Sequence, residues 1–281
     1  MNKIEKVGFV IKAHAPEVKE ILADLFTYFN EKKIACVLEE VAAEKLGLPQ
    51  GMRREDIPEN VDLVIVLGGD GTLLSIAYIA AQEDVPVIGV NMGALGFLTE
   101  VPLNEMFVTL DNYLEGNDKI VSQRMLLQAK TRENSYFSLN DVVINKGALA
   151  RMIRCAIWID GKRIAMTRAD GLIISTPTGS TAYSLSAGGP IIQPHIPAII
   201  ITPICPHTLS FRPMVISSES EVKVQLLTAG EEVYLTIDGQ RGELMKKDDW
   251  VTVCPSGLKL QLVSSPRRNY FDLLMEKLRW G

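Results

Sequence analysis

The segment Gly-Gly-Asp-Gly-Thr at residues 68–72 has residue types that could bring phosphate and a hydroxyl nucleophile together. It lies between the apolar run 61–67, typical of a buried strand, and the apolar stretch 73–82, typical of a helix. Backbone N–H groups at the start of a helix bind anions, and glycine lets a phosphate approach the backbone closely. The residues expected to meet a phosphate are Gly68, Gly69, Gly71 and Thr72.

The acidic residue of this segment, Asp70, is not expected to bind phosphate directly, because a carboxylate repels phosphate. The segment also lacks the Gly-Lys-Ser/Thr of a P-loop, so it contains no lysine to hold phosphate. We therefore expect Asp70 to orient a hydroxyl nucleophile or to bind a magnesium ion. The alternative, which the motif alone leaves equally open, is that Asp70 or Thr72 only caps the helix.

Residues 170–191 form a second candidate site, because the segment is dense in hydroxyls and glycines and carries no charge after Asp170. Neutral donors of this kind suit a polar ligand that bears phosphates, and Tyr183 could stack on a ring. An ordinary turn region is the alternative, although the length of the segment favours binding. The hydroxyl residues are Ser175, Thr176, Thr178, Ser180, Thr181, Ser184 and Ser186.

Three weaker candidates surround this segment in the sequence. Asn140 and Asp141 could bind ribose hydroxyls, although an Asn-Asp pair is more often part of a turn. Asp238-Gly239 is typical of a hairpin turn, in which Gln240 would be a bystander. The loose basic set of Arg151, Arg154 and Arg168 is, residue by residue, typical of a solvated surface.

The elements that must position these residues differ between the two halves of the chain. Up to about residue 120, short apolar strands alternate with helices, which predicts βαβ units around a parallel sheet. Beyond residue 120, apolar and polar residues alternate, which is typical of strands, and Asp160-Gly161 is typical of a hairpin turn. A helix is expected only at 270–280. The strands are expected at 6–12, 34–40, 61–67 and 85–91, the helices at 15–33 and 72–82, a surface loop at 41–60, and alternating strands in 152–171, 221–240 and 248–265.

The predicted fold is therefore an N-terminal Rossmann-like α/β domain followed by a C-terminal all-β, sandwich-like domain. We expect the first domain at residues 1–120 and the second at 121–265. The final segment, 266–281, contains the helix and is expected to pack back on the first domain.

Composition limits the classes of function. The chain has 281 residues and a net charge of −5, which argues against a broad nucleic-acid surface. No apolar run reaches the ~18 residues of a membrane span, and the N-terminus does not resemble a leader, so a cytoplasmic protein is expected. The four cysteines and three histidines show no metal-ligand spacing, so no metal site made of protein side chains is predicted.

Taken together, the motifs resemble the NAD kinases of the bacterial type. The resemblance is carried by "STPTGSTAYSLSAGGP" (175–190), "LNDVVI" (139–144), "TIDGQ" (236–240) and "NMGALGFLTE" (91–100), in this family's order along nearly the whole chain. It implies transfer of the γ-phosphoryl group of ATP to the 2′-hydroxyl of the adenosine ribose of NAD, giving NADP. It also implies a divalent metal ion, Mg²⁺, and a homodimer or homotetramer.

The resemblance assigns roles residue by residue. Asp70 would be the catalytic proton acceptor, with Gly71 beside it at the NAD site. The other implied NAD-binding residues are Asn140, Asp141, Arg151, Arg168, Asp170, Thr181, Ala182, Tyr183, Ser184, Leu185, Ser186 and Gln240.

The sequence departs from the common pattern of the family at two places. Ser75 stands where many relatives have a basic residue, and the segment 190–200 is shorter than in many of them.

Two other functions stay open. The motif Gly-Gly-Asp-Gly is shared with diacylglycerol and sphingosine kinases and with 6-phosphofructokinases, so a lipid kinase of the diacylglycerol type is one alternative. A non-catalytic dinucleotide sensor is the other, although binding alone does not require Asp70.

Overall fold

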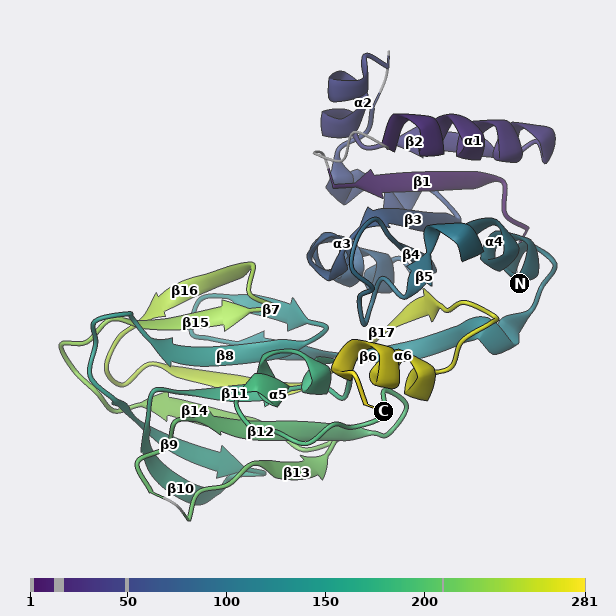
Figure 1. Cartoon of the computed structure of the whole chain (residues 1–281). Helices are drawn as coiled ribbons and strands as arrows, with labels where there is room; N and C mark the ends of the chain where they lie inside the picture. Colours follow the sequence, from purple (N-terminus) through teal and green to yellow (C-terminus); the bar gives the residue numbers. More distant parts are fainter. Residues whose placement is uncertain (1–2, 13–17, 49–50, 209, 281) are drawn as a thin grey trace. The chain divides into compact units, whose positions relative to one another are not determined.

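The computed structural model describes residues 3–12, 18–48, 51–208 and 210–280 (Figure 1). The chain divides into two compact units. Unit 1 comprises residues 1–123 and 259–281, and unit 2 comprises residues 124–258. Among the described residues, no helix is long and apolar enough to cross a membrane.

Unit 1 is built on a parallel sheet in the strand order β2-β1-β3-β4, with the end of β17 beside β4. Strands β1, β3 and β4 are apolar and almost wholly buried, as expected for a parallel sheet. The strands are β1 (Lys6–Ile11), β2 (Ala35–Leu38), β3 (Leu63–Gly68), β4 (Val87–Asn91), the short β5 (Val101–Pro102) paired with β4, and the last residues of β17 (Trp250–Val263).

The helices of unit 1 supply the apolar side chains that cover this sheet. Leu22, Leu25 and Phe29 of α1 join a buried cluster with Phe9 of β1, and the ring of Phe9 meets that of Phe29 edge-on. Apolar residues at this spacing form one face of a helix, as the sequence predicts. The helices are α1 (Val18–Glu31), α2 (Glu40–Leu46), α3 (Asp70–Gln82), α4 (Met106–Leu114) and α6 (Tyr270–Leu278).

Three expectations for unit 1 need correction. The segment 41–60 is not only a loop: it continues α2 and contains two 3₁₀ turns, η1 (Arg54–Asp56) and η2 (Pro58–Asn60), because Ala42 and Ala43 of α2 are buried. Helix α4 was not predicted at all. Helix α3 begins at Asp70 rather than at residue 72, and its N-cap is Gly69, so neither Asp70 nor Thr72 is the cap. Residues 15–17 of the first expected helix lie outside the described residues.

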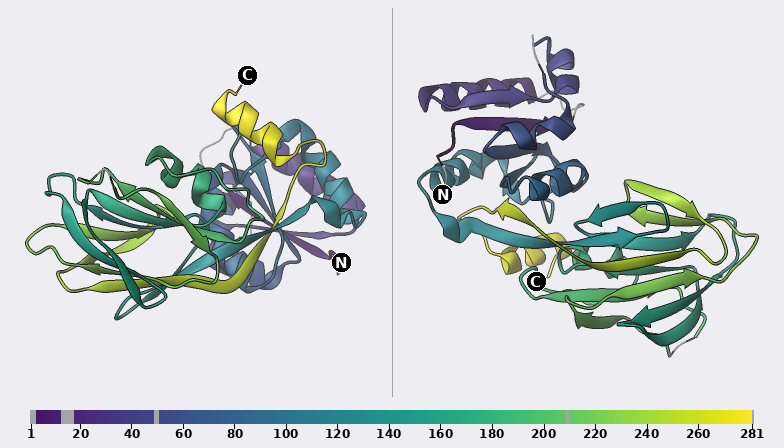
Figure 2. Two further views of the ribbon diagram at one scale, coloured as in Figure 1. Left: turned by 90° about the horizontal axis from the view of Figure 1, so that it is seen from below. Right: turned by 180° about the vertical axis from the view of Figure 1, so that it is seen from behind.

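Unit 2 is a sandwich of two antiparallel sheets, as predicted (Figure 2). Alternate residues of both sheets share one buried cluster, which follows from the period of two along a strand. One sheet has the order β13-β12-β11-β8-β15-β16, from β13 (Met214–Ser217), β12 (Ala198–Ile204), β11 (Gly171–Ser175), β8 (Asp141–Lys146), β15 (Val233–Ile237) and β16 (Arg241–Met245). The other has β10 (Lys162–Ala169), β9 (Ile153–Ile159), β14 (Val222–Leu226) and the first part of β17, with β6 (Val121–Lys130) and β7 (Ser135–Ser138) attached.

The hairpin predicted at Asp160-Gly161 is confirmed. Both residues have positive φ, 49° and 76°, and the turn joins β9 to β10. The two alternating runs in 221–240 belong to different sheets, because β14 pairs with β9 and β17 whereas β15 pairs with β8 and β16.

Candidate active site

The carboxylate of Asp70 in unit 1 is held by a loop that follows β4. Its Oδ1 accepts hydrogen bonds from Leu98 N at 3.1 Å, Thr99 N at 2.9 Å and Thr99 Oγ1 at 2.9 Å. Its Oδ2 accepts one from the described residues, from Phe97 N at 2.9 Å. Three donors therefore fix Oδ1, whereas Oδ2 keeps room for a further donor such as a substrate hydroxyl.

The glycines around Asp70 fall into two groups. A Cβ on Gly96 would lie 2.0 Å from Asp70 Oδ1, and one on Gly89 would lie 2.6 Å from Leu98 O, so both must be glycine for the loop to reach the carboxylate. Gly69 and Gly71 have open space where a Cβ would stand, and neither has positive φ. Packing therefore does not explain these two glycines, whereas a ligand that approaches the backbone would.

The same loop is fastened to the end of β4 by Asn91. Its Nδ2 donates to Ala94 O at 2.6 Å, and its Oδ1 accepts from Gly93 N at 2.6 Å. The segment "NMGALGFLTE" carries part of the family resemblance, but its sequence does not indicate what it does. In unit 1 it supplies the hydrogen-bond donors for Asp70. Most of these donors are backbone N–H groups, which every residue type except proline has, so the residue types do not reveal them.

Unit 2 contains a second clamped carboxylate, Asp238, which the sequence assigned only to a turn. The turn is present, with φ of 50° at Asp238 and 66° at Gly239. In addition, the Asp238 carboxylate accepts hydrogen bonds from one hydroxyl and three consecutive backbone N–H groups. The donors are Ser138 Oγ (2.8 Å), Leu139 N (2.8 Å), Asn140 N (2.8 Å) and Asp141 N (3.0 Å).

Two carboxylates thus lie close in the buried part of this site. Burial, and then the neighbouring Asp238, raise the pKa of Asp141 to about 7. Burial also raises the pKa of Asp238, although its four hydrogen bonds act in the opposite direction. Asp141 is only 5% exposed, which agrees with burial as the larger cause of its raised pKa.

The hydroxyl-rich segment packs directly on the Asn140-Asp141 loop. Thr176 donates from Oγ1 to Leu139 O at 2.6 Å and from its backbone N to Asn140 O at 2.9 Å. A Cβ on Gly179 would lie 2.0 Å from Asn140 O, so only glycine fits there. The motifs at 139–144 and 175–190 are therefore parts of one structure, built where β8 begins and β11 ends.

Several hydroxyls of this segment form hydrogen bonds to other groups of unit 2. Ser180 Oγ donates to Pro177 O at 2.6 Å, Thr181 Oγ1 to Thr178 O at 3.2 Å, and Ser184 Oγ shares a hydrogen bond of 2.8 Å with Thr202 Oγ1. The Tyr183 ring is 43% exposed, at the start of the short helix α5 (Tyr183–Ser186). Among the described residues, the hydroxyls of Ser175 and Thr178 are buried without a hydrogen-bond partner.

The remaining predicted site residues lie at different places in unit 2. Arg154 and Arg168 stand opposite each other on β9 and β10, in the sheet that does not contain β8 and β11. Asp170 forms an ion pair of 3.3 Å with Lys146. Gln240 is exposed directly after the Asp238-Gly239 turn, and Arg151 is exposed, with its backbone N bound to Glu231.

Family models match most of the chain. Residues 7–118 match the ATP-NAD kinase N-terminal domain, and residues 139–265 match the ATP-NAD kinase C-terminal domain. The NAD kinase of Geobacter sulfurreducens is 46% identical over 99% of both chains, and that of Solibacter usitatus is 42% identical over 100% of this chain and 99% of its own. The chain belongs to the NAD kinase family.

Solved structures of NAD kinases have the same fold. A crystal structure of yeast NADH kinase with NADH is 26% identical, with a TM-score of 0.88 over 99% of this chain and 88% of that chain. A crystal structure of an Archaeoglobus fulgidus NAD kinase with ATP has a TM-score of 0.79 and 24% identity, over 98% of this chain and all of that one. The family is one of kinases, so this chain is a phosphotransferase; these matches give no support to a lipid kinase or a non-catalytic sensor.

Proposed function

We propose that this protein transfers the γ-phosphoryl group of ATP to the 2′-hydroxyl of the adenosine ribose of NAD and thereby produces NADP. The observation that carries the proposal is the Asp70 carboxylate, one oxygen of which has a single donor among the described residues, beside Gly69 and Gly71, where a Cβ would meet nothing within 4 Å. The bound NADH of the yeast enzyme and the bound ATP of the Archaeoglobus fulgidus enzyme support the two substrate classes.

In this proposal Asp70 is the catalytic residue, and its two oxygens have different tasks. Oδ1, with three donors, anchors the side chain, and Oδ2 accepts the hydrogen of the ribose 2′-hydroxyl. Phosphoryl transfer passes through a loose transition state, so orientation of the nucleophile matters more than strong basicity. A carboxylate is a weak base, which suits a proton that leaves late in the reaction.

The donor phosphates would meet the start of α3. Gly68 ends β3, Gly69 caps the helix, and the backbone at Gly71 and Thr72 forms its first turn. The macrodipole at this end favours negative charge, and the two open glycines let a phosphate approach. Asp70 projects from the same turn, which would place nucleophile and donor at one point.

The dinucleotide would bind in unit 2, on the loop that Asp238 holds. Asn140 and Asp141 lie on that loop, and Tyr183 offers an exposed ring for stacking. Family resemblance supports the other binding residues, which remain proposals: Gly71, Arg151, Arg168, Asp170, Thr181, Ala182, Ser184, Leu185, Ser186 and Gln240.

Magnesium does not fit as an ion held by this protein's side chains alone. Within the described part of the chain, no three His, Cys, Asp or Glu side chains come together as a metal site. The Asp70 carboxylate is already bound by the loop at 97–99. We propose that Mg²⁺ arrives with the phosphates of ATP, as is common for this ion, and we assign it no step of its own.

Two further features are proposed from the family resemblance. The protein would act in the cytoplasm, and it would do so as a homodimer or homotetramer. Light scattering on the purified chain measures the assembly, and a monomer at micromolar concentration would contradict it.

The test of the proposed function is an assay of the purified protein with ATP, Mg²⁺ and NAD, coupled to a dehydrogenase that accepts only NADP. NADP should accumulate, and an NAD analogue without the adenosine 2′-hydroxyl should give no phosphorylated product. A parallel reaction with diacylglycerol in place of NAD should consume no ATP. Phosphorylated lipid, or tight binding of NADP without turnover, would favour one of the two other functions.

A further inference from the structure

The loop that holds Asp70 is itself contacted by the C-terminal helix of unit 1. Lys277, in the last turn of α6, donates from Nζ to the backbone oxygen of Leu95. The same ammonium group lies over the Phe97 ring, 5.6 Å from its centroid. One side chain thus contacts two residues of the loop, and the second of these also provides the N–H that binds Asp70 Oδ2.

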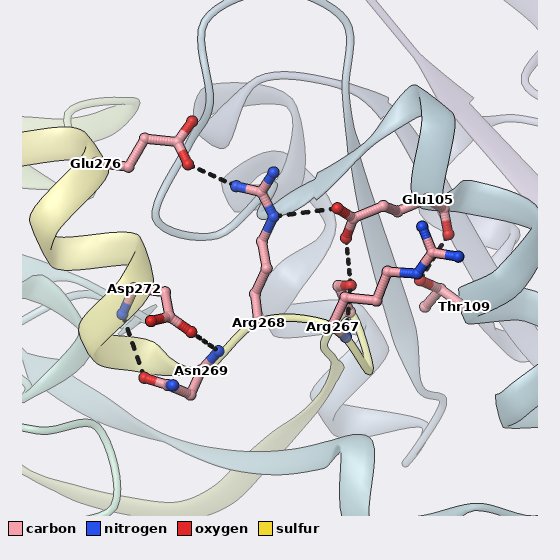
Figure 3. A network of polar contacts seen from close by, with 8 residues as sticks. Glu105, Thr109, Arg267, Arg268, Asn269, Asp272 and Glu276 are labelled. Atoms are coloured by element: carbon pink, nitrogen blue, oxygen red, sulfur yellow. Dashed lines mark hydrogen bonds and ion pairs between the residues drawn. The ribbon is translucent and has the colours of Figure 1, made fainter.

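Helix α6 is tied to Glu105 through Arg268, which also binds the last turn of the helix, as Figure 3 shows. Arg268, just before the helix, donates from Nε to Glu105 Oε1 at 3.3 Å and from Nη1 to Glu276 Oε2 at 2.6 Å. Glu105 is only 6% exposed and also accepts the hydroxyl of Ser265. A buried carboxylate with two donors is a strong anchor, because breaking it leaves an unpaired charge.

The start of α6 is also capped on both sides. Asn269 accepts from the backbone N of Phe271 and Asp272, and the Asp272 side chain accepts from Asn269 N at 2.9 Å, which forms a capping box (Figure 3). Leu273 and Leu274 are buried on the inner face. A helix with a fixed start and a buried face holds its last turn in one place, so Lys277 reaches the loop from a rigid support.

We propose that Lys277 is a positioning residue for the phosphoryl transfer. By holding the Leu95 carbonyl and the Phe97 ring, it fixes the Phe97 N–H, and this N–H orients the one oxygen of Asp70 that is left for the substrate hydroxyl. Among the described residues, Phe97 N is the single donor to Oδ2, so a shift of this amide turns Oδ2 while the three donors of Oδ1 stay in place. The inference rests on the proposed function of Asp70.

An exposed lysine more often makes a weak surface contact that contributes little to stability. A positioning role and a surface contact predict different results for a substitution of Lys277. Loss of a mere surface contact would change neither turnover nor the order of the loop. A small error in the position of a reacting group can slow a reaction strongly.

The experiment compares Lys277→Met with Lys277→Arg and with Lys19→Met, an exposed lysine of α1 that serves as the matched control. Lys277→Met should lower kcat about fivefold or more while the KM values for ATP and NAD stay within about twofold. Lys277→Arg should keep most of the turnover, since arginine can also donate to a carbonyl and stack on a ring. Lys19→Met should match the wild-type protein.

A double-mutant cycle with Asp70→Asn shows whether Lys277 acts through Asp70. In the Asp70→Asn protein, Lys277→Met should cause no further loss of kcat, whereas a general structural role would lower it again. An unchanged kcat in Lys277→Met, or an equal loss in the Asp70→Asn background, would overturn the proposal.

Hydrogen exchange separates this inference from the proposed function. Amide exchange in residues 96–99 should be faster in Lys277→Met than in wild type or Lys19→Met, whether or not the wild-type protein makes NADP. Absence of NADP from the wild-type protein would refute the proposed function only. Unchanged amide exchange in residues 96–99 would refute the proposed role of Lys277 and leave the proposed function untouched.

Discussion

Asp70 in unit 1 and Asp238 in unit 2 are bound in the same way by different loops. Each carboxylate accepts one hydroxyl and three consecutive backbone N–H groups, from residues 97–99 for Asp70 and from residues 138–141 for Asp238. In each, three donors meet Oδ1 and one meets Oδ2. The pattern of hydrogen bonds therefore does not distinguish a carboxylate proposed to be catalytic from one that only holds a loop in place.

What distinguishes the two is their surroundings. Asp70 begins a helix between two glycines that have open space beside them. Asp238 sits in a hairpin turn with the buried carboxylate of Asp141 as its neighbour. In the proposed function, the same pattern of hydrogen bonds thus serves one loop beside the reacting group and another that holds a binding surface.

The strongest way to break this comparison is Asp70→Asn. The amide keeps an acceptor for the Oδ1 donors but cannot accept the proton, so kcat should fall about 10²–10⁴-fold, or roughly 3–5 kcal/mol. The KM for NAD should change little. Steady-state kinetics measure both, and near-normal turnover would remove Asp70 from the chemistry.

Asp238→Asn should instead destabilise unit 2. Its amide nitrogen would face the N–H of Leu139, and the cost should be about 1–3 kcal/mol in the free energy of unfolding. Asp248→Asn is the matched control, because Asp248 is an exposed aspartate of unit 2 that also has positive φ. In chemical denaturation, the free energies of unfolding of the two variants should differ by this amount. Both variants should keep a kcat close to that of the wild-type protein at saturating NAD. Equal stability would mean that the Asp238 clamp contributes nothing.

The Asp141–Asp238 pair predicts an effect of pH on the stability of unit 2. Asp141 in the folded protein holds its proton up to about pH 7, whereas an aspartate of the unfolded chain releases it near a pKa of about 3.9. Folding therefore takes up a proton between these values, and the stability that the raised pKa provides is lost as pH rises.

The melting temperature should accordingly fall between about pH 4 and about pH 7. Asp141→Asn, which cannot ionise, should flatten this part of the curve. Calorimetry on both proteins measures the difference, and parallel curves would show that Asp141 does not titrate in this range.

The smallest expected effect is that of Tyr183→Ala on NAD binding. Loss of one stacked ring should raise the KM for NAD about threefold to tenfold, which corresponds to ~0.5–1.5 kcal/mol. Tyr234→Ala is the control, since Tyr234 is a tyrosine of unit 2 that is exposed to a similar degree, 41% against 43%. Equal KM values in the two variants would mean that Tyr183 is not part of the binding surface.

Local patterns were enough to predict the fold. Strand and helix periods gave the α/β part and the sandwich, and Asp160-Gly161 gave its hairpin, because each depends on residues close in the sequence. The exceptions, α2 and α4, are short helices. In α2, buried alanines take the place of the larger apolar residues that mark a helix period, and Gly47 with φ of 67° ends it.

The candidate site was predicted only in part, for a physical reason. The position of Asp70 after β3 follows from the motif itself, but its donors come from the backbone of residues 97–99, and any residue type carries an N–H. Asp238 was assigned to a turn because the turn explains both Asp and Gly. Its second task involves residues about 100 positions earlier in the chain, which no local pattern can reveal.

The central claim is that Asp70 directs the γ-phosphoryl group of ATP to one hydroxyl of NAD. The most direct measurement is the position of the new phosphate in the purified product, from the coupling between phosphorus and ribose protons in NMR spectra. The account predicts coupling to the 2′ proton of the adenosine ribose only. Phosphate on a 3′-hydroxyl, on the nicotinamide ribose or on no dinucleotide at all would contradict it.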